Sequence, residues 1–368
     1  MTVVEFRREL HRHPELSFEE HRTQQFIIDV LAAEGIECRA IAGTGVIAKI
    51  EGRRGNLQRA VVLRADIDAL PIVEKNDVEY RSEREGVMHA CGHDMHAAVL
   101  FGVLQAMHAE RNFEGTLFGV FQPGEELNPG GASLVLGEKP FEGYNVAAVI
   151  GEHVDARLEV GEVGICPGRF MAANDELRFY VSGRGGHAAR RNEIDDSVTA
   201  MCDMVVRTTA LNTPESVVSI GKVVADGATN VIPDRVSAEG TMRTFDQEER
   251  QRIHGLLRSN AESVEQKYGV RVEVDINHGY PCVVNDITLA YEAMIVAVDE
   301  GLVVRELEPM TTAEDFGYYT ELYPSLFYRL GVGKHAGGSH TATFLPDEEA
   351  LEIGVRMMQR MALHVLNK

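Results

Sequence analysis

Three short apolar runs constrain the fold of this 368-residue chain more than any other feature. Residues 60–63, 117–121 and 146–150 are almost free of polar side chains, as expected for strands buried on both faces of a largely parallel sheet. Open α/β sheets place their functional sites at the carboxyl ends of such strands. The runs therefore predict an α/β domain, with helices on both faces of a mixed, mostly parallel sheet and one site at its carboxyl edge.

Each of the three runs leads directly into acidic or imidazole side chains. The first continues into RADID at residues 64–68, the second into QPGEE at 122–126, and the third into GEH at 151–153. Taken singly, Asp66 and Asp68 could merely cap a turn, and adjacent glutamates in a Gly/Pro-bounded loop usually mark a solvated turn. Three buried strands that all end in this way are hard to ascribe to chance, so we expect a site there.

A cluster of soft ligands lies at residues 88–96, where MHACGHDMH contains one thiol and three imidazoles. Thiolate and imidazole are preferred by borderline-soft divalent metals, although buried histidines alone are as often core residues. Five plausible ligands come from separate segments: Cys91, His93, Glu126, His153 and His340. Ligands spread over the whole chain favour an open catalytic site, which one or two metals could occupy, over a closed structural one.

Hydrolysis at such a site requires a general base that does not itself bind the metal. Glu125 has the right chemistry and stands beside the candidate ligand Glu126. A carboxylate there could move a proton from water to a leaving amine. The sequence thus predicts metal-dependent hydrolysis with Glu125 as the acid/base.

The pattern of apolar and polar residues changes at about residue 172. Half-exposed strands and two helices follow in the order β-α-β-β-α-β, with strands at 176–182, 217–224, 235–244 and 270–276 and helices at 195–210 and 247–267. This is the split βαβ, ferredoxin-like arrangement. We expect an inserted α+β domain at 172–280 within a metal-binding domain formed by 1–171 and 281–368.

Local signals also predict the N-terminal helices. Residues 3–13 have helical apolar spacing and end before Pro14. Ser17 is expected to cap the next helix, with Glu20 as its capping-box partner and Gly35 at its end.

Charge and cysteine content limit the partners and the compartment. The formal net charge of −21 argues against nucleic acid and anionic membranes as partners, because both reward basic patches. The five cysteines are scattered and odd in number, which favours a reducing compartment over a disulfide framework. No apolar run approaches the roughly 20 residues of a membrane helix, and no signal peptide is evident. We expect a cytoplasmic protein.

Several motifs together resemble one family. They are HRHPE at 11–15, RADIDALP at 64–71, MHACGHD at 88–94, FQPGEE at 121–126, GGHAA at 185–189, NVIP at 230–233, GTMRT at 240–244 and EDF at 314–316. At these positions the chain resembles the binuclear metal amidohydrolases of the aminoacylase/carboxypeptidase superfamily. The most similar subgroup contains hippurate hydrolases, auxin–amino acid conjugate hydrolases and bacterial N-acetyldiaminopimelate deacetylase.

The resemblance implies roles for individual residues. It assigns the five candidate ligands to two divalent metals (Mn, Zn, Co or Ni), Glu125 to acid/base catalysis, and Asp68 to orienting a ligand. His187 would reach the substrate carbonyl oxygen, in its own or a partner subunit, while Asn230 and Arg243 would hold the free carboxylate of the substrate. Relatives usually have alanine where this chain has Gly124.

The resemblance also implies an activity and an assembly. We expect hydrolysis of the amide bond of an N-acyl amino acid, with N-acetyl-diaminopimelate as the leading substrate. A broad aminoacylase or hippurate-type hydrolase is the alternative within the enzyme class. A non-catalytic metal- or peptide-binding protein is a third, which the presence of Glu125 and Arg243 argues against. The inserted domain would act as a lid and form a homodimer, or part of a higher oligomer.

Overall fold

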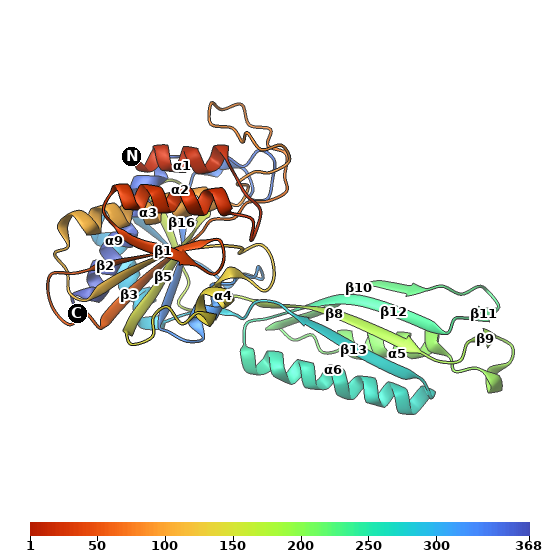
Figure 1. Ribbon diagram of the computed structural model, residues 1–368. Coiled ribbons are helices and arrows are strands. Elements are labelled where there is room, and N and C mark those ends of the chain that lie inside the picture. Colours follow the sequence, from red (N-terminus) through yellow and green to blue (C-terminus); the bar gives the residue numbers. More distant parts are fainter. The chain divides into compact units, whose positions relative to one another are not determined.

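The computed structural model describes residues 1–368, and the chain divides into two compact units (Figure 1). The larger unit comprises Met1–Phe170, Val284–Pro309 and Asp315–Lys368, and the smaller one comprises Met171–Val283 and Met310–Glu314. The sequence pattern placed the inserted domain at 172–280, close to these bounds. It did not place Met310–Glu314 there, and this short segment joins the smaller unit through a β-bridge between Met310 and Met171.

An eight-stranded mixed sheet forms the centre of the larger unit. In spatial order its strands are β1 (Glu37–Ile41), β2 (Gly45–Glu51), β4 (Thr116–Gln122), β3 (Arg59–Asp66), β5 (Asn145–Asp155), β16 (Ser325–Gly331), β6 (Glu162–Ile165) and β15 (Val303–Glu306). The four strands β4, β3, β5 and β16 run parallel, and every residue of β4 and β16 is buried. The predicted fold class is confirmed, because uninterrupted apolar runs could only be satisfied at the centre of a sheet covered on both faces.

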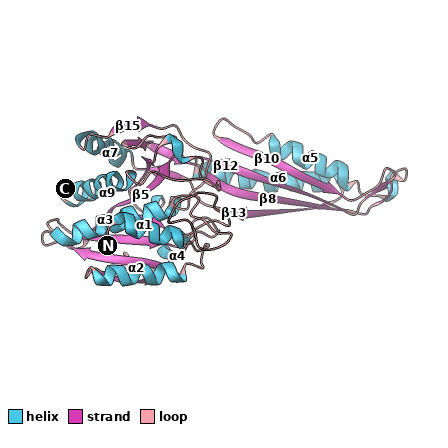
Figure 2. Cartoon of the chain, turned by 90° about the horizontal axis from the view of Figure 1, so that it is seen from above, coloured by secondary structure: helices cyan, strands magenta, loops and turns pink.

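Helices cover the two faces of this sheet unequally (Figure 2). The helices of the larger unit are α1 (Val3–Arg12), α2 (His21–Ala33), α3 (His93–Glu110), α4 (Gly131–Gly137), α7 (Ile287–Asp299), α8 (Gly317–Thr320) and α9 (Ala350–Leu366). Leu63 of β3 joins the core formed with α1, α3 and α9, so its neighbour Arg64 points to the opposite face. There Arg64 pairs with Asp315, just before α8, and both α4 and α8 contact strands of the sheet.

The smaller unit is a four-stranded antiparallel sheet with two helices. Its strands, in spatial order, are β10 (Ser216–Ala225), β12 (Arg235–Thr244), β8 (Ala173–Ser182) and β13 (Arg271–His278). Residues of β8 alternate between buried and exposed, and the buried set packs with α5 (Ser197–Thr209) and α6 (Gln247–Tyr268). A two-residue pair, β9 (Gly186–His187) and β11 (Val231–Ile232), extends from one end of the sheet.

The remaining elements are short. They are β7 (Gly168–Met171), β14 (Val283–Asn285) and the 3-10 turns Arg191–Glu193 and Lys334–Ala336. No helix in the protein is both long enough and apolar enough to span a membrane.

The predicted cap of the second helix is wrong. Helix α2 begins at His21, and neither Ser17 nor Glu20 forms a side-chain cap to it. Instead the Ser17 hydroxyl donates to Asp68, and the Glu20 carboxylate accepts a hydrogen bond from the backbone N–H of Gly124. Tertiary partners therefore replaced the local hydrogen bonds that the sequence spacing had suggested.

Candidate metal centre

The carboxyl edge of the parallel strands gathers the predicted site. Strands β4, β3 and β5 are neighbours, with Asp66 at the end of β3 in register with Gln122 at the end of β4. Asp68 follows β3 by two residues, Glu125 and Glu126 follow β4, and His153 lies near the end of β5. Because parallel strands share their carboxyl edge, residues distant in the sequence meet there.

Two further segments complete the group. Cys91 precedes α3, and His93 is the first residue of that helix. His340 lies in the loop after β16 with a positive φ of 62°, and its backbone N–H donates to the carbonyl of Ala90 at 2.7 Å. That bond holds the loop beside the Cys91 segment.

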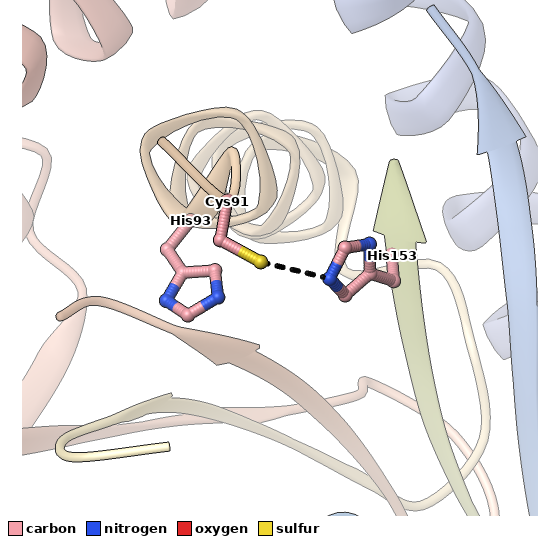
Figure 3. A group of neighbouring side chains, drawn as sticks. All are labelled: Cys91, His93 and His153. Carbon is pink, nitrogen blue, oxygen red and sulfur yellow. Dashed lines mark hydrogen bonds between the residues drawn. The ribbon is translucent and has the colours of Figure 1, made fainter. Parts of the chain in front are cut away.

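The other four candidate ligands converge on Cys91. Its Sγ lies 3.3 Å from Nε2 of His153 and 3.2 Å from Nε2 of His340, which in turn is 3.1 Å from Oε1 of Glu126. The donor atoms form two groups that could each hold a cation, Cys91–His93–His153 and Cys91–Glu126–His340, with donors within 4.8 Å of one another. Figure 3 shows the Cys91 sulfur between the imidazoles of His93 and His153. One thiol is therefore common to both groups.

The imidazoles are held with a ring nitrogen available for a metal. Nδ1 of His93 lies 2.9 Å from Oδ1 of Asp68, while the buried Nε2 of His93 has no hydrogen-bond partner. Nδ1 of His153 donates to the carbonyl of Val154 at 2.7 Å, which leaves Nε2 facing Cys91. Carboxylate or carbonyl acceptors at Nδ1 with Nε2 directed inward are the usual support of metal-binding histidines. The donor set fits a borderline-soft divalent cation.

The pKa values of the site also favour a bound cation. Burial raises the pKa of the Cys91 thiol to about 12, so the thiolate requires a nearby cation at neutral pH. Burial alone would lower the pKa of His93, but the neighbouring Asp66 carboxylate raises it well above its usual range. The pocket thus carries negative charge that a cation would balance.

Glu125 lies at the rim of this group. Its carboxylate is within 4.8 Å of donor atoms of His93 and Glu126, and the residue is 7% exposed. A nearly buried carboxylate beside the candidate ligands has the location that a proton carrier at this site would need.

One supporting network was not predicted. Asp66 accepts from His96 Nδ1 at 2.6 Å and pairs with Arg64 at 2.7 Å. Nε2 of His96 accepts from the backbone N–H of Val154 at 2.9 Å, directly after His153. In the sequence, the acidic end of the strand at Asp66 indicated a site. The packing of α3 on β5 shows in addition that Asp66 and His96 support the segment that carries His153.

The remaining predicted residues lie in the smaller unit, where they separate into two places. His187 in β9 pairs with Val231 in β11, and the N–H of Ala188 donates to the carbonyl of Asn230 at 2.9 Å. Both His187 and Asn230 are exposed at this end of the sheet (Figure 1). They are therefore close neighbours.

Arg243 lies at the other end of the same sheet. It is eight residues along β12 from Arg235, so at about 3.3 Å per residue it is roughly 26 Å away. It is half-buried, and its guanidinium donates to Thr241 Oγ1 and to the carbonyl of Met242. One small amino acid cannot contact both Asn230 and Arg243 of the same chain, so the pair does not form a single carboxylate clamp within one subunit.

Comparison with known proteins gives consistent matches along the chain. The model of the family described as Peptidase family M20/M25/M40 matches residues 62–364. The N-acetylcysteine deacetylase of Bacillus subtilis is 36% identical, with 99% of this chain and 97% of that protein covered. The N-acetyldiaminopimelate deacetylase of Anoxybacillus flavithermus is 35% identical, with 97% and 96% covered.

A solved structure is similar over the same length. The Bacillus subtilis YXEP protein, described as a dinuclear metal binding peptidase from the M20 family, superposes with a TM-score of 0.87. It is 35% identical in sequence, and the match covers 99% of this chain and 97% of that chain.

Proposed function

Because the chain belongs to peptidase family M20/M25/M40, we propose that it is a metal-dependent hydrolase of the amide bond of N-acyl amino acids. Two relatives that match almost its full length are named as deacetylases of N-acetylated amino acids. The observation that carries the proposal is the convergence of four ligand-type side chains on Cys91, a fifth, with Glu125 beside them. A catalytic carboxylate next to a metal group suits hydrolysis better than simple metal storage.

The proposed metal content is two divalent cations. Cys91, His93 and His153 would hold one cation, and Cys91, Glu126 and His340 would hold the other. The two donor groups that share Cys91 and the partnerless Nε2 of His93 support this arrangement, as does the dinuclear description of the YXEP protein. Such cations supply Lewis-acid polarisation of a carbonyl and a source of hydroxide near neutral pH.

The protein's own side chains would then carry the proton and the substrate. The Glu125 carboxylate accepts a proton from the attacking water and delivers it to the amide nitrogen as the carbon–nitrogen bond breaks. The products are a carboxylic acid and a free amino acid. His187 donates to the developing oxyanion, and Arg243 pairs with the substrate carboxylate, for which a guanidinium is well suited.

The leading substrate is N-acetyl-diaminopimelate, and a broad aminoacylase or hippurate-type specificity is the alternative. The test is kcat/KM of the metal-loaded enzyme on N-acetyl-diaminopimelate, N-acetylcysteine and hippurate. A tenfold preference corresponds to about 1.4 kcal/mol of transition-state stabilisation. A preference of at least that size for the first substrate supports the leading assignment, and similar values across the panel support the alternative.

Replacing Glu125 by glutamine tests the catalytic assignment. The amide cannot accept the proton, so kcat should fall by about 10²–10⁴-fold while two metals per chain are retained. Elemental analysis of the same samples provides the metal count, and Glu126→Gln is the matched control, expected to lose metal. If Glu125→Gln instead lost its metals and regained full rate when they were restored, Glu125 would be a ligand.

We further propose that the protein is a cytoplasmic homodimer formed through the smaller unit. Strand β10 is an edge of the four-stranded sheet and exposes Val217, Val223 and Val224. Val206 on α5, which contacts β10, is also exposed, at 66%. Unpaired edges with apolar side chains favour strand pairing with a second copy. The five scattered cysteines favour a reducing compartment.

A further inference from the structure

Two buried carboxylates bind the backbone on either side of Glu125. The N–H of Gly124 donates to Oε1 of Glu20 at 2.8 Å, and the N–H of Glu126 donates to Oδ2 of Asp68 at 3.0 Å. The carbonyl of Gly124 also accepts from the N–H of Gly131 at 3.1 Å. The peptide units before and after the proposed proton carrier are therefore fixed from outside the loop.

Both of these carboxylates depend on one short segment between α1 and α2. Glu20 belongs to it, and Ser17, three residues earlier, donates to Oδ2 of Asp68 at 2.7 Å. The ring of Phe18 packs on Gly124 so closely that a Cβ added there would lie 2.2 Å from its Cε1 atom. The segment thus contacts the Glu125 loop at its backbone and along its surface.

Burying the Glu20 carboxylate is energetically unfavourable unless its oxygens accept hydrogen bonds. The residue is fully buried, and burial raises the pKa of its carboxyl group. Removing a carboxylate from water is unfavourable by several kcal/mol unless hydrogen bonds replace the lost hydration. Glu20 makes no cap to α2; its oxygens accept from Gly124 N–H and from the Thr44 hydroxyl. A helix start alone would be served by an exposed serine or aspartate.

We propose that Glu20 is a positioning residue for Glu125, acting through the Gly124 peptide. This inference rests on the proposed role of Glu125 as the proton carrier. Without the Glu20 acceptor, the peptide unit that carries the Gly124 N–H can rotate. This rotation would move the Glu125 carboxylate away from the water and the leaving nitrogen. Misplacement of a catalytic group by about 1 Å can lower the rate by about 10²-fold.

The test compares Glu20→Ala, Glu20→Gln and the surface control Glu19→Ala, all as full-length, metal-loaded enzyme. Glu20→Ala should lower kcat by about 10–100-fold, with KM changed by less than about threefold and two metals retained. Glu20→Gln keeps an oxygen that accepts from Gly124, so it should restore kcat to within about threefold of wild type. Glu19, whose side chain is 61% exposed, should be silent.

A second measurement detects the hydrogen bond between Gly124 and Glu20 without depending on catalytic turnover. Hydrogen exchange of the peptide covering Gly124–Glu126 should be at least about tenfold faster in Glu20→Ala than in wild type, and unchanged in Glu20→Gln. An active wild type with Glu20→Ala equally active per metal-loaded molecule would overturn the inference and leave the proposed function standing. An inactive wild type would remove the proposed function, and unchanged exchange in Glu20→Ala would then overturn the positioning as well.

Discussion

At the residue scale, Asp68 has more contacts than its predicted role required. The resemblance implied that it orients one ligand, and its Oδ1 indeed lies at the Nδ1 of His93. The structure adds the Ser17 hydroxyl and the backbone N–H of Glu126 as donors. Burial alone would raise the pKa of Asp68, but the hydrogen bond from His93 and the other donors keep it below its usual range. An ionised Asp68 therefore fixes the tautomer of His93 and part of the Glu125 loop.

Replacing Asp68 by asparagine should weaken metal binding. The variant keeps the shape of the side chain but loses the charge that holds Nδ1–H of His93, and such supporting partners typically contribute 10–100-fold to metal affinity. Competition with a chelator, followed by elemental analysis, measures the change. Ser17→Ala is the control, because it removes only one hydrogen bond, worth about 1 kcal/mol. Unchanged affinity in Asp68→Asn would show that His93 is not held through this carboxylate.

At the element scale, helix α1 fixes the start of α3, whose first residue is the candidate ligand His93. Arg7 Nε lies 2.7 Å from Oδ2 of Asp94, the second residue of α3, and Nδ1 of His11 lies 2.8 Å from the same oxygen. Nε2 of His11 is 3.1 Å from Glu74. All four side chains are essentially buried. The network gives a structural role to part of the HRHPE motif, for which the sequence alone provided none.

Two adjacent arginines on α1 allow a matched stability test. Arg7→Met leaves Asp94 buried without its guanidinium, and breaking a buried pair in this way typically lowers the free energy of unfolding by about 3–5 kcal/mol. Arg8 is 39% exposed and pairs with Glu348, so Arg8→Met should lower it by less than about 1 kcal/mol. Urea unfolding of both variants measures the difference. Equal effects would show that the Arg7–Asp94 pair adds nothing beyond surface charge.

At the scale of the whole molecule, the separation of His187 from Arg243 bears on the proposed dimer. The two ends of the smaller sheet are too far apart for one substrate to reach both within a chain. Catalysis that uses both residues therefore calls for a second subunit, so that His187 of one chain serves the site of the other. In a two-fold dimer both sites would be completed in the same way.

Mixing two inactive variants tests this exchange. Random dimers of His187→Ala and Glu125→Gln chains are half mixed, and each mixed dimer would contain one complete site if His187 acts across the interface. About a quarter of wild-type activity should therefore return after joint refolding or co-expression. A mixture of Glu125→Gln with Cys91→Ser is the control and should stay inactive, because both residues serve their own chain. No recovery in the first mixture would place His187 in its own subunit.

The sequence alone determined the fold class, the family and the chemical types at the site. Central strands must be continuously apolar, so the runs at 60–63, 117–121 and 146–150 identified neighbouring strands, which became β3, β4 and β5. The motifs predicted a metal amidohydrolase family, and the family match confirms it. These properties depend on local features of the sequence: the periodicity of its apolar residues and the identity of the residues that follow each strand.

Only the tertiary structure decided which groups touch. It showed which groups His96 supports, since its two nitrogens bind Asp66 and the backbone N–H of Val154. It also redirected Ser17 and Glu20 from a helix cap to the loops around Glu125, and it set Asn230 apart from Arg243. Hydrogen bonds between residues dozens of positions apart depend on how helices and strands pack. The spacing of residues within one segment does not specify that packing.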